Sequence, residues 1–334
     1  MTTKKRVLSG MRPTGAAHLG HLLGAFENWE AMQDEYDTFY CIVDWHALTT
    51  DYADTSQLKA NTHELALDFL AVGLDAERST LFVQSHVPQH AELHLLLSMV
   101  VPLPWLTRVP TYKEQMNQLR EKDLTTYGFL GYPLLQSADI LIYRADTVPV
   151  GVDQAPHVEL TREIARRFNN FYGPVLPEPE VKLTPTPKLP GTDGRKMSKS
   201  YRNTIGLAED EASIRKKLKT MVTDPARKLR TDPGDPAICP VFDLHKVFST
   251  QETRDWAADG CRTAGIGCIE CKSALADALV PRLEPIRARR EAFEKRPDHV
   301  RDIFREGGRK AREVAESTMV DVRAAIKLPT EDDL

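Results

Sequence analysis

The chain has 334 residues, of which 41% are hydrophobic and 28% are charged, and its formal charge at pH 7 is −4. This composition is typical of a folded globular protein of about two domains. It excludes a disordered chain, a fibre and a small disulfide scaffold. A protein that coats DNA would be strongly basic, so we expect no DNA partner, and any contact with nucleic acid must come from a local basic patch.

The first 190 residues alternate short β-rich runs with longer amphipathic stretches. Apolar runs predict strands at residues 6–9, 39–44, 79–84, 140–143 and 148–150. Apolar residues spaced three and four apart predict helices at residues 19–33, 56–72 and 157–168. Alternating strands and helices indicate an α/β domain with a doubly wound, mostly parallel, Rossmann-like sheet. Ligands of such sheets bind beyond the C-terminal ends of the strands.

A proline-rich segment, Pro174–Pro190, ends this pattern and is predicted to be a linker. Beyond it, strand signals fade and helical periodicity dominates. Helices are predicted at residues 210–221, 251–264, 273–294 and 298–326. We therefore expect a smaller α-helical second domain.

Nothing in the sequence directs the chain out of the cytoplasm. The basic start, Met1–Arg6, is followed by too few apolar residues for a signal peptide. The longest apolar run, Leu95–Leu106, is interrupted by Pro102 and Pro104, whereas a membrane span needs about 20 apolar residues. We expect a cytoplasmic protein with no membrane partner.

A turn rich in glycine and histidine follows the first predicted strand. Gly10 and Gly15 allow an anion to approach backbone N–H groups at the start of the next helix. His18 and His21 lie three residues apart, on one face of that helix, where two imidazoles can donate hydrogen bonds to a phosphate. Taken alone, two surface histidines at a helix start explain the pattern equally well.

A basic motif, Gly194–Ser200, follows the proline-rich segment. Lys196 and Lys199 lie three residues apart on a flexible loop. Their ammonium groups suit the neutralisation of charge that develops on a pyrophosphate leaving group. Taken alone, a solvated basic loop is the alternative.

Together, His18-Leu19-Gly20-His21 and Lys196-Met197-Ser198-Lys199-Ser200 resemble the paired signature of class I aminoacyl-tRNA synthetases. The stretches 132–139, 148–154 and 157–162 look like those of the tryptophan and tyrosine subgroup, and the chain as a whole is similar to bacterial tryptophanyl-tRNA synthetases. The resemblance implies a Rossmann-like catalytic domain over residues 1–190, a helical tRNA- and anticodon-binding domain over 191–300, and a C-terminal helix in 301–334 that packs back on the catalytic domain.

The activity that this resemblance implies has two steps. L-tryptophan reacts with Mg-ATP to give tryptophanyl-adenylate and pyrophosphate, and the tryptophanyl group then passes to the 3′ end of tRNA(Trp). The resemblance also implies a homodimer. A tyrosine-specific homologue stays open, because Gln136 is similar to the residue of the tyrosine enzymes. So does a non-charging paralogue that binds tryptophan or RNA as a regulator.

The resemblance assigns three groups of site residues, carried over motif by motif. The expected catalytic residues are His18, His21, Lys196 and Lys199. The expected ATP-binding residues are Arg12, Pro13, Thr14, Gly20, His21, Gly151, Val152, Asp153, Lys196, Met197, Ser198, Lys199 and Ser200. The expected tryptophan-binding residues are Leu8, Gly10, His46, Tyr132, Gln136, Asp139 and Gln154.

Asp139 is expected to accept the indole N–H, because distinguishing one aromatic ring from another requires a buried polar group that only one substrate satisfies. A capping or salt-bridged carboxylate, placed just before the predicted strand at 140–143, is the alternative.

Four of the five cysteines lie close together in the sequence, with the spacing C-x21-C-x6-C-x2-C. Cys239, Cys261, Cys268 and Cys271 are the candidate metal ligands, whereas Cys41 fits a buried thiol. Four thiolates suit either zinc or a [4Fe–4S] cluster. A subset of tryptophanyl-tRNA synthetases resembles this chain in its cysteine pattern and carries a [4Fe–4S] cluster, which is therefore the expected cofactor. Zinc, or an empty or oxidised site, are the alternatives.

The segment 195–230 is strongly basic. It contains eleven lysines and arginines and four acidic residues, a net charge of +7 in a chain of net charge −4. Its place between the lysine motif and the cysteines favours contact with the tRNA backbone.

Overall fold

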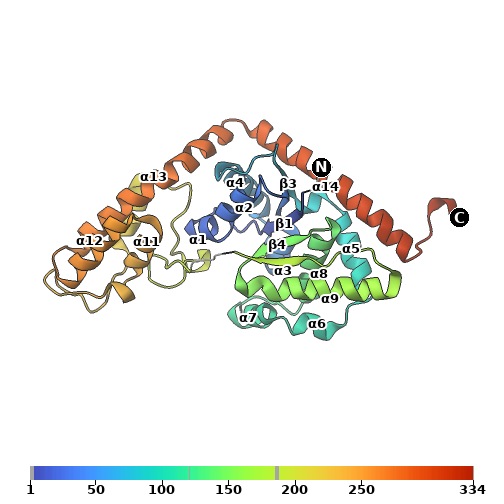
Figure 1. Ribbon diagram of the computed structural model, residues 1–334, viewed down its shortest axis with the longest axis horizontal. Coiled ribbons are helices and arrows are strands. Elements are labelled where there is room, and N and C mark those ends of the chain that lie inside the picture. Colours follow the sequence, from blue (N-terminus) through green and yellow to red (C-terminus); the bar gives the residue numbers. More distant parts are fainter. Residues whose placement is uncertain (1–3, 120, 185–187, 334) are drawn as a thin grey trace.

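The computed structural model describes residues 4–119, 121–184 and 188–333. Figure 1 shows an α/β body that contains the sheet and an all-helical body beside it, with the long helix α13 running from the helical body to the α/β body and α14 continuing along the α/β body. None of the helices in this described part is both long and apolar enough to cross a lipid bilayer.

A parallel sheet forms the centre of the α/β body and confirms the predicted fold class. Within the described ranges its five strands lie in the order β3-β2-β1-β4-β5, and every neighbouring pair is parallel. The strands are β1 (Arg6–Met11), β2 (Asp37–Ile42), β3 (Ser79–Val83), β4 (Thr147–Val150) and β5 (Glu180–Leu183). The order changes direction between β1 and β4, which is where a doubly wound sheet opens a ligand crevice.

Helices cover both faces of the sheet because alternate strand residues face opposite sides. Tyr40 and Ile42 of β2 join one apolar cluster, and Phe39 and Cys41 join the other. The covering helices are α1 (Leu19–His21), the π-helical turn Leu22–Phe26, α2 (Glu27–Met32), α3 (Asp44–Asp51), α4 (Leu58–Ala71), α5 (Gln89–Ser98), α6 (Leu103–Thr107), α7 (Pro110–Gln118), α8 (Tyr127–Ile142) and α9 (Ala155–Tyr172).

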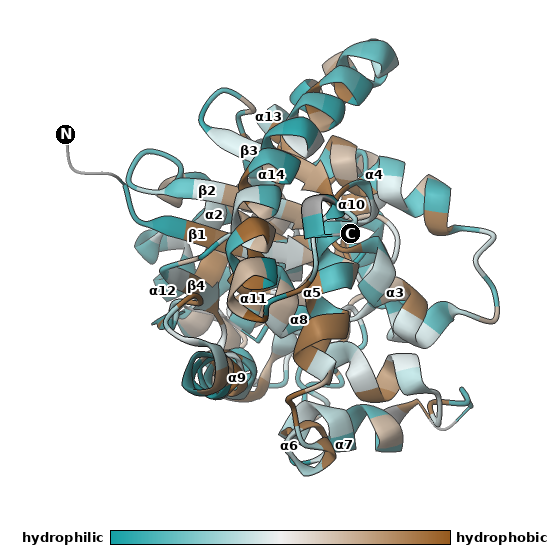
Figure 2. Ribbon diagram, turned by 90° about the vertical axis from the view of Figure 1, so that its right-hand side faces the viewer, coloured by the Kyte–Doolittle hydropathy of each residue, from teal (hydrophilic) through white to brown (hydrophobic). Residues whose placement is uncertain are grey.

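The strand predicted at residues 140–143 is wrong. Ile140 and Ile142 belong to the last turn of α8, and Tyr143 is its C-cap. A short apolar run fits a buried strand or a helix buried on most sides, and periodicity alone does not separate them. Figure 2 shows hydrophobic ribbon along α8, which lies inside the α/β body.

The proline-rich segment is only in part the predicted linker, because it contains the edge strand β5. Residues 185–187 lie outside the described part of the chain.

The helical body confirms the helices predicted after the linker, and α13 begins earlier than predicted, at Cys268. Its elements are α10 (Glu211–Thr220), α11 (Pro240–Phe248), α12 (Gln251–Arg262) and the first half of α13 (Cys268–Glu294). Helix α13 then runs on to pack against α4 of the α/β body, and α14 (Pro297–Ala325) packs along β3 and α5.

Helix α14 covers the open edge of the sheet at β3, in direct backbone contact. A Cβ atom built on Gly307 would lie 1.8 Å from the carbonyl oxygen of Leu81 in β3. Covering an edge strand with a helix prevents it from pairing with another chain. The absence of a side chain at residue 307 is therefore what allows this packing.

We expect Gly307→Ala to destabilise the protein by about 3 kcal/mol, because the helix must move off the strand. The adjacent Gly308→Ala is the matched control. Its Cβ would make ordinary contacts with His86 Cβ at 3.6 Å and Arg312 Nη1 at 3.7 Å, and alanine should stabilise the helix by about 0.5–1 kcal/mol. Urea unfolding of both variants measures the difference, and equal free energies of unfolding would contradict the packing described.

Candidate active site

A cavity of about 350 Å³ opens at the C-terminal ends of β1, β2 and β4, at the change of strand order. The seven residues predicted to bind tryptophan all line it. They are Leu8, Gly10, His46, Tyr132, Gln136, Asp139 and Gln154. Sequence reasoning missed other polar lining residues, among them Asn28 and Gln115, because no motif marks them.

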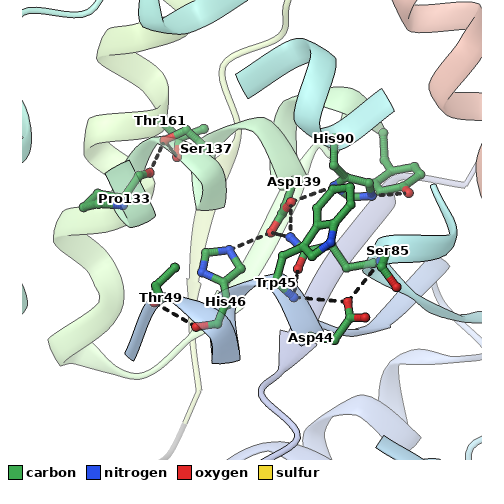
Figure 3. Close-up of polar contacts among 12 residues, drawn as sticks. Asp44, Trp45, His46, Thr49, Ser85, His90, Pro133, Ser137, Asp139 and Thr161 are labelled. Carbon is green, nitrogen blue, oxygen red and sulfur yellow. Dashed lines mark hydrogen bonds and ion pairs between the residues drawn. The ribbon is translucent and has the colours of Figure 1, made fainter. Parts of the chain in front are cut away.

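Asp139 lies on α8 at the wall of this cavity and is 5% exposed. Its Oδ2 accepts a hydrogen bond from His46 Nε2 at 2.9 Å. Its Oδ1 accepts one from His90 Nδ1 at 2.6 Å, and the Gln84 amide donates to both oxygens at 2.8 and 2.9 Å. Figure 3 shows Asp139 between His46 and His90. The aspartate therefore lies within α8, close to its C-terminal end, and is hydrogen-bonded by other side chains; it is not a helix cap.

Behind Asp139, the network continues into the core. His90 Nε2 lies 2.7 Å from the Tyr143 hydroxyl, and both residues are fully buried. His90 therefore links the Asp139 carboxylate to the Tyr143 hydroxyl, and each of these buried polar groups has a partner. Burial opposes the charge on Asp139, but His90 and His46 outweigh it and lower the pKa of Asp139 below its usual value.

Asp139 thus has an anionic carboxylate whose hydrogen-bonding positions are occupied by side chains of the protein. Of these partners, His46 also lines the cavity, whereas Gln84 and His90 lie behind the carboxylate. A ligand N–H that reaches Asp139 therefore has to share or replace the hydrogen bond from His46.

Tyr132 and His157 form a second polar group on the cavity wall. The Tyr132 hydroxyl lies 3.0 Å from Thr111 Oγ1, which in turn lies 2.6 Å from His157 Nε2. Burial lowers the pKa of His157 to about 4, so the imidazole is neutral at pH 7. This arrangement holds the Tyr132 ring in one orientation against the cavity.

The two histidines of the first motif lie together at the start of α1. The Gly20 N–H donates to His18 Nδ1 at 3.1 Å, and the His18 N–H donates to His21 Nδ1 at 3.2 Å. Burial and Lys199 lower the pKa of His18 to about 4; burial, His18 and Lys199 lower that of His21 to about 2. Both imidazoles are neutral with Nδ1 as acceptor, so each has an Nε2–H to donate.

The lysine motif docks on the loop that precedes these histidines. Lys199 Nζ donates to the Gly15 carbonyl oxygen at 2.6 Å, and burial lowers the pKa of Lys199 to about 8. Behind it, the Leu207 N–H donates to the Ala17 carbonyl at 3.0 Å, and His18 pairs with Gly206 in an isolated β-bridge. Lys199 therefore lies with His18 and His21, whereas Lys196 is exposed.

The other predicted ATP residues fall into separate places. Arg12 and Gly151 line the cavity, and Val152 and Asp153 are exposed in the short 3₁₀ turn after β4. Pro13 and Thr14 lie in the loop after β1, and Gly20 lies in α1. Met197, Ser198 and Ser200 lie in the lysine motif.

The four candidate metal ligands gather in the helical body. Cys239 precedes α11, Cys261 lies in α12, and Cys268 and Cys271 lie in the first turn of α13. Burial, together with the other three thiols, raises the pKa of Cys271 to about 12, which shows that the four are neighbours. They are free thiols, and no group of three or more His, Cys, Asp or Glu in the described residues is arranged to hold a metal ion.

The family model described as "tRNA synthetases class I (W and Y)" matches residues 1–284. The chain belongs to this family. Among similar synthetases is a tryptophan–tRNA ligase of Thermotoga maritima, which is 54% identical, with 97% of this chain and 99% of the relative covered. One of Ralstonia nicotianae is 46% identical, with 97% and 98% covered.

A solved synthetase structure has the same architecture. The tryptophanyl-tRNA synthetase of Campylobacter jejuni, complexed with ADP and tryptophan, superimposes with a TM-score of 0.87 at 32% identity, covering 97% of this chain and 100% of that one. In the present chain, the residues matched by the family model include the sheet, the cavity, the lysine motif and the four cysteines.

Proposed function

We infer that this chain is a tryptophan–tRNA ligase, which activates L-tryptophan with ATP and transfers it to tRNA(Trp). The observation that carries this conclusion is a cavity of mixed apolar and polar lining with a buried, hydrogen-bonded carboxylate in its wall. It opens at the C-terminal ends of the strands, where the motif histidines also follow β1. The names of the relatives at 46% and 54% identity support it.

Tryptophan binding is assigned to the cavity. Asp139 accepts the indole N–H in place of the hydrogen bond from His46, so the buried anion discriminates against rings that cannot donate there. Tyr132, Gln136 and Gln154 hold the α-amino group and the adjoining wall, and Leu8 and Gly10 contact the ring.

Activation proceeds by attack of the tryptophan carboxylate on the α-phosphorus of Mg-ATP. A new oxygen–phosphorus bond forms, the bond to the β-phosphate breaks, and the negative charge moves to the departing pyrophosphate. The neutral Nε2–H groups of His18 and His21 donate to the phosphates, and Lys196 and Lys199 neutralise the leaving group. Little covalent work falls to the protein, so positioning and charge supply the catalysis.

The remaining ATP contacts are assigned to the segments near the motif histidines and to the turn after β4. The proposed triphosphate-binding residues are Arg12, Pro13, Thr14 and Gly20, with Met197, Ser198 and Ser200 carrying the two lysines. Gly151, Val152 and Asp153 are proposed to face the ribose and adenine.

The second step places tRNA(Trp) along the helical body. We assign residues 1–190 to catalysis, 191–300 to tRNA and anticodon binding, and 301–334 to the C-terminal helix that covers the sheet. The basic segment 195–230 supplies positive charge for the tRNA backbone.

Tryptophan-dependent exchange between ATP and pyrophosphate tests the function, with tyrosine as the control substrate. We expect exchange with tryptophan alone. Exchange with tyrosine alone would favour the tyrosine-specific alternative, and no exchange with either amino acid would contradict the synthetase function and leave the non-charging regulator open.

Asp139→Asn tests the proposed reader of the indole N–H. Because an amide is a weaker acceptor than a carboxylate, we expect the KM for tryptophan to rise by about 10- to 100-fold. For the tryptophan analogue with sulfur in place of the indole N–H, the substitution should raise KM much less. If tryptophan and the analogue lose affinity equally, Asp139 has no role in reading the N–H.

The lowered pKa of Lys199 predicts a pH dependence for ATP. The ammonium is charged below its pKa of about 8 and loses its proton above it. We expect kcat/KM for ATP, which reports the free enzyme, to fall as the pH rises through about 8. Lys199→Arg should move the fall to higher pH, and an unchanged profile would contradict the assignment.

We also propose that Cys239, Cys261, Cys268 and Cys271 hold a [4Fe–4S] cluster. The four thiols are neighbours, but in the described residues they are not arranged around one metal ion. Zinc requires four ligands around a single ion, whereas a [4Fe–4S] cluster spreads its four thiolates over several irons, so we favour the cluster. Their free state suits the cytoplasm, where we place the enzyme.

Anaerobic purification tests the cluster. We expect brown protein with absorbance near 400 nm and about four irons per chain. Serine at any of the four positions should remove both signals, whereas Cys41→Ala should keep them. Colourless protein with one zinc would establish the zinc alternative, and colourless protein without metal would overturn a metal site.

A homodimer is proposed on the outer face of α5, α6 and the start of α8. Leu95, Met99, Leu103 and Tyr127 are more than half exposed there. A second copy of the chain would cover this apolar surface. The mass in solution is the measurement that checks it.

A further inference from the structure

A buried carboxylate supports the histidine motif from the side away from the cavity. Asp68 of α4 is 2% exposed, and its Oδ2 accepts a hydrogen bond from the Ala17 N–H at 2.7 Å. Ala17 directly precedes His18, whose own main-chain N–H holds the His21 ring. The backbone position of Ala17 therefore influences where both imidazoles lie.

The other oxygen of Asp68 forms an ion pair with Arg290 near the C-terminal end of α13. Arg290 is 6% exposed and also contacts Glu64 at 2.5 Å and Glu294 at 2.9 Å. Helix α13 begins at the cysteines, and near its other end Arg290 binds Asp68, the residue that holds the Ala17 N–H.

Stability alone is a weak explanation for such a pair. Removing two charges from water costs several kcal/mol per ion, and an apolar pair of similar size is often as stable. What an apolar pair would not supply is an acceptor for the Ala17 N–H, which would then be buried without a partner.

Two charged side chains hold the loop between Gly15 and Ala17. Lys199 Nζ binds the Gly15 carbonyl, and Asp68 binds the Ala17 N–H. Asp68 is also the charge that opposes the fall in the pKa of Lys199 caused by burial. Neither Asp68 nor Arg290 lines the cavity, so neither would contact the amino acid.

We propose that Asp68 and Arg290 are a positioning pair for the nucleotide: Arg290 orients Asp68, and Asp68 fixes the Ala17 backbone so that His18 and His21 meet the phosphates. This rests on the proposed function, because it takes the motif histidines as phosphate donors. It makes α13, a helix of the tRNA-binding half, part of the ATP site.

The electrostatics of Asp68 support a role for Arg290 beyond packing. Burial raises the pKa of Asp68, whereas Arg290 and the Ala17 N–H oppose that rise. Without Arg290, the carboxyl is driven toward its neutral form, which is a weaker acceptor.

The test compares Asp68→Asn, Arg290→Gln and Arg290→Lys with the full-length wild type in pyrophosphate exchange. We expect the KM for ATP to rise about tenfold in Asp68→Asn and Arg290→Gln, as for loss of a charge-assisted hydrogen bond. The KM for tryptophan should stay within twofold, and Arg290→Lys, which keeps the charge, should recover part of the ATP affinity.

Arg289→Gln is the matched control. Arg289 lies next to Arg290 and also joins α13 to α4, by donating to the Ala71 carbonyl at 2.6 Å, but it does not reach the motif loop. We expect its KM for ATP to match the wild type.

A merely structural role would give a different pattern. Equal losses for ATP and tryptophan, equal effects of Arg289→Gln, or an unchanged KM for ATP in Arg290→Gln would each overturn the proposal. Calorimetric titration with ATP compares the affinities of the variants without turnover. Titration of each variant with tryptophan is the folding control, because an unchanged tryptophan affinity shows that the variant is folded. If the wild type itself shows no tryptophan-dependent exchange, the proposed function fails instead.

Discussion

The loop between β1 and α1 must be held in one conformation, and much of the surrounding structure serves that constraint. The loop has few side chains of its own to pack, so its backbone groups are satisfied from outside. Leu207 and Lys199 bind its carbonyl oxygens, and Asp68 binds an N–H. Segments from both halves of the chain therefore contact the loop. The hydrogen bonds of Lys199 and Leu207 to the loop also fix the position of the lysine motif.

Desolvation decides the chemistry on both sides of this loop. Burial keeps His18, His21 and His157 neutral, which leaves their imidazoles as hydrogen-bond donors and acceptors rather than fixed charges. Asp139 is equally buried but stays anionic, because several donors converge on it. Burial thus leaves the phosphate-facing histidines neutral, whereas the donors around Asp139 keep that group charged against the effect of burial.

Sequence reasoning succeeded where a local pattern has a single structural meaning. Alternating apolar runs and amphipathic stretches predicted the parallel sheet. The residues assigned to tryptophan, from Leu8 to Gln154, all line one cavity, and their binding role stays a prediction. It failed at Ile140–Tyr143, because an apolar run buried on most sides carries no period that separates strand from helix. Sequence reasoning gave Lys196 and Lys199 the same role and could not show that the docked loop leaves Lys199 half-buried against Gly15 and Lys196 exposed.

The sequence by itself determined the fold class, the family and the chemical types that the site offers: imidazoles, ammonium groups, a carboxylate and clustered thiols. Only the tertiary structure decided which of them touch. Gln84, His90 and Tyr143 surround Asp139, and Arg290 reaches Asp68, across separations in the chain that no local pattern spans. These contacts exist because packing of the sheet and helices brings distant residues together and removes water from between them, and only then does each polar group require its particular partner.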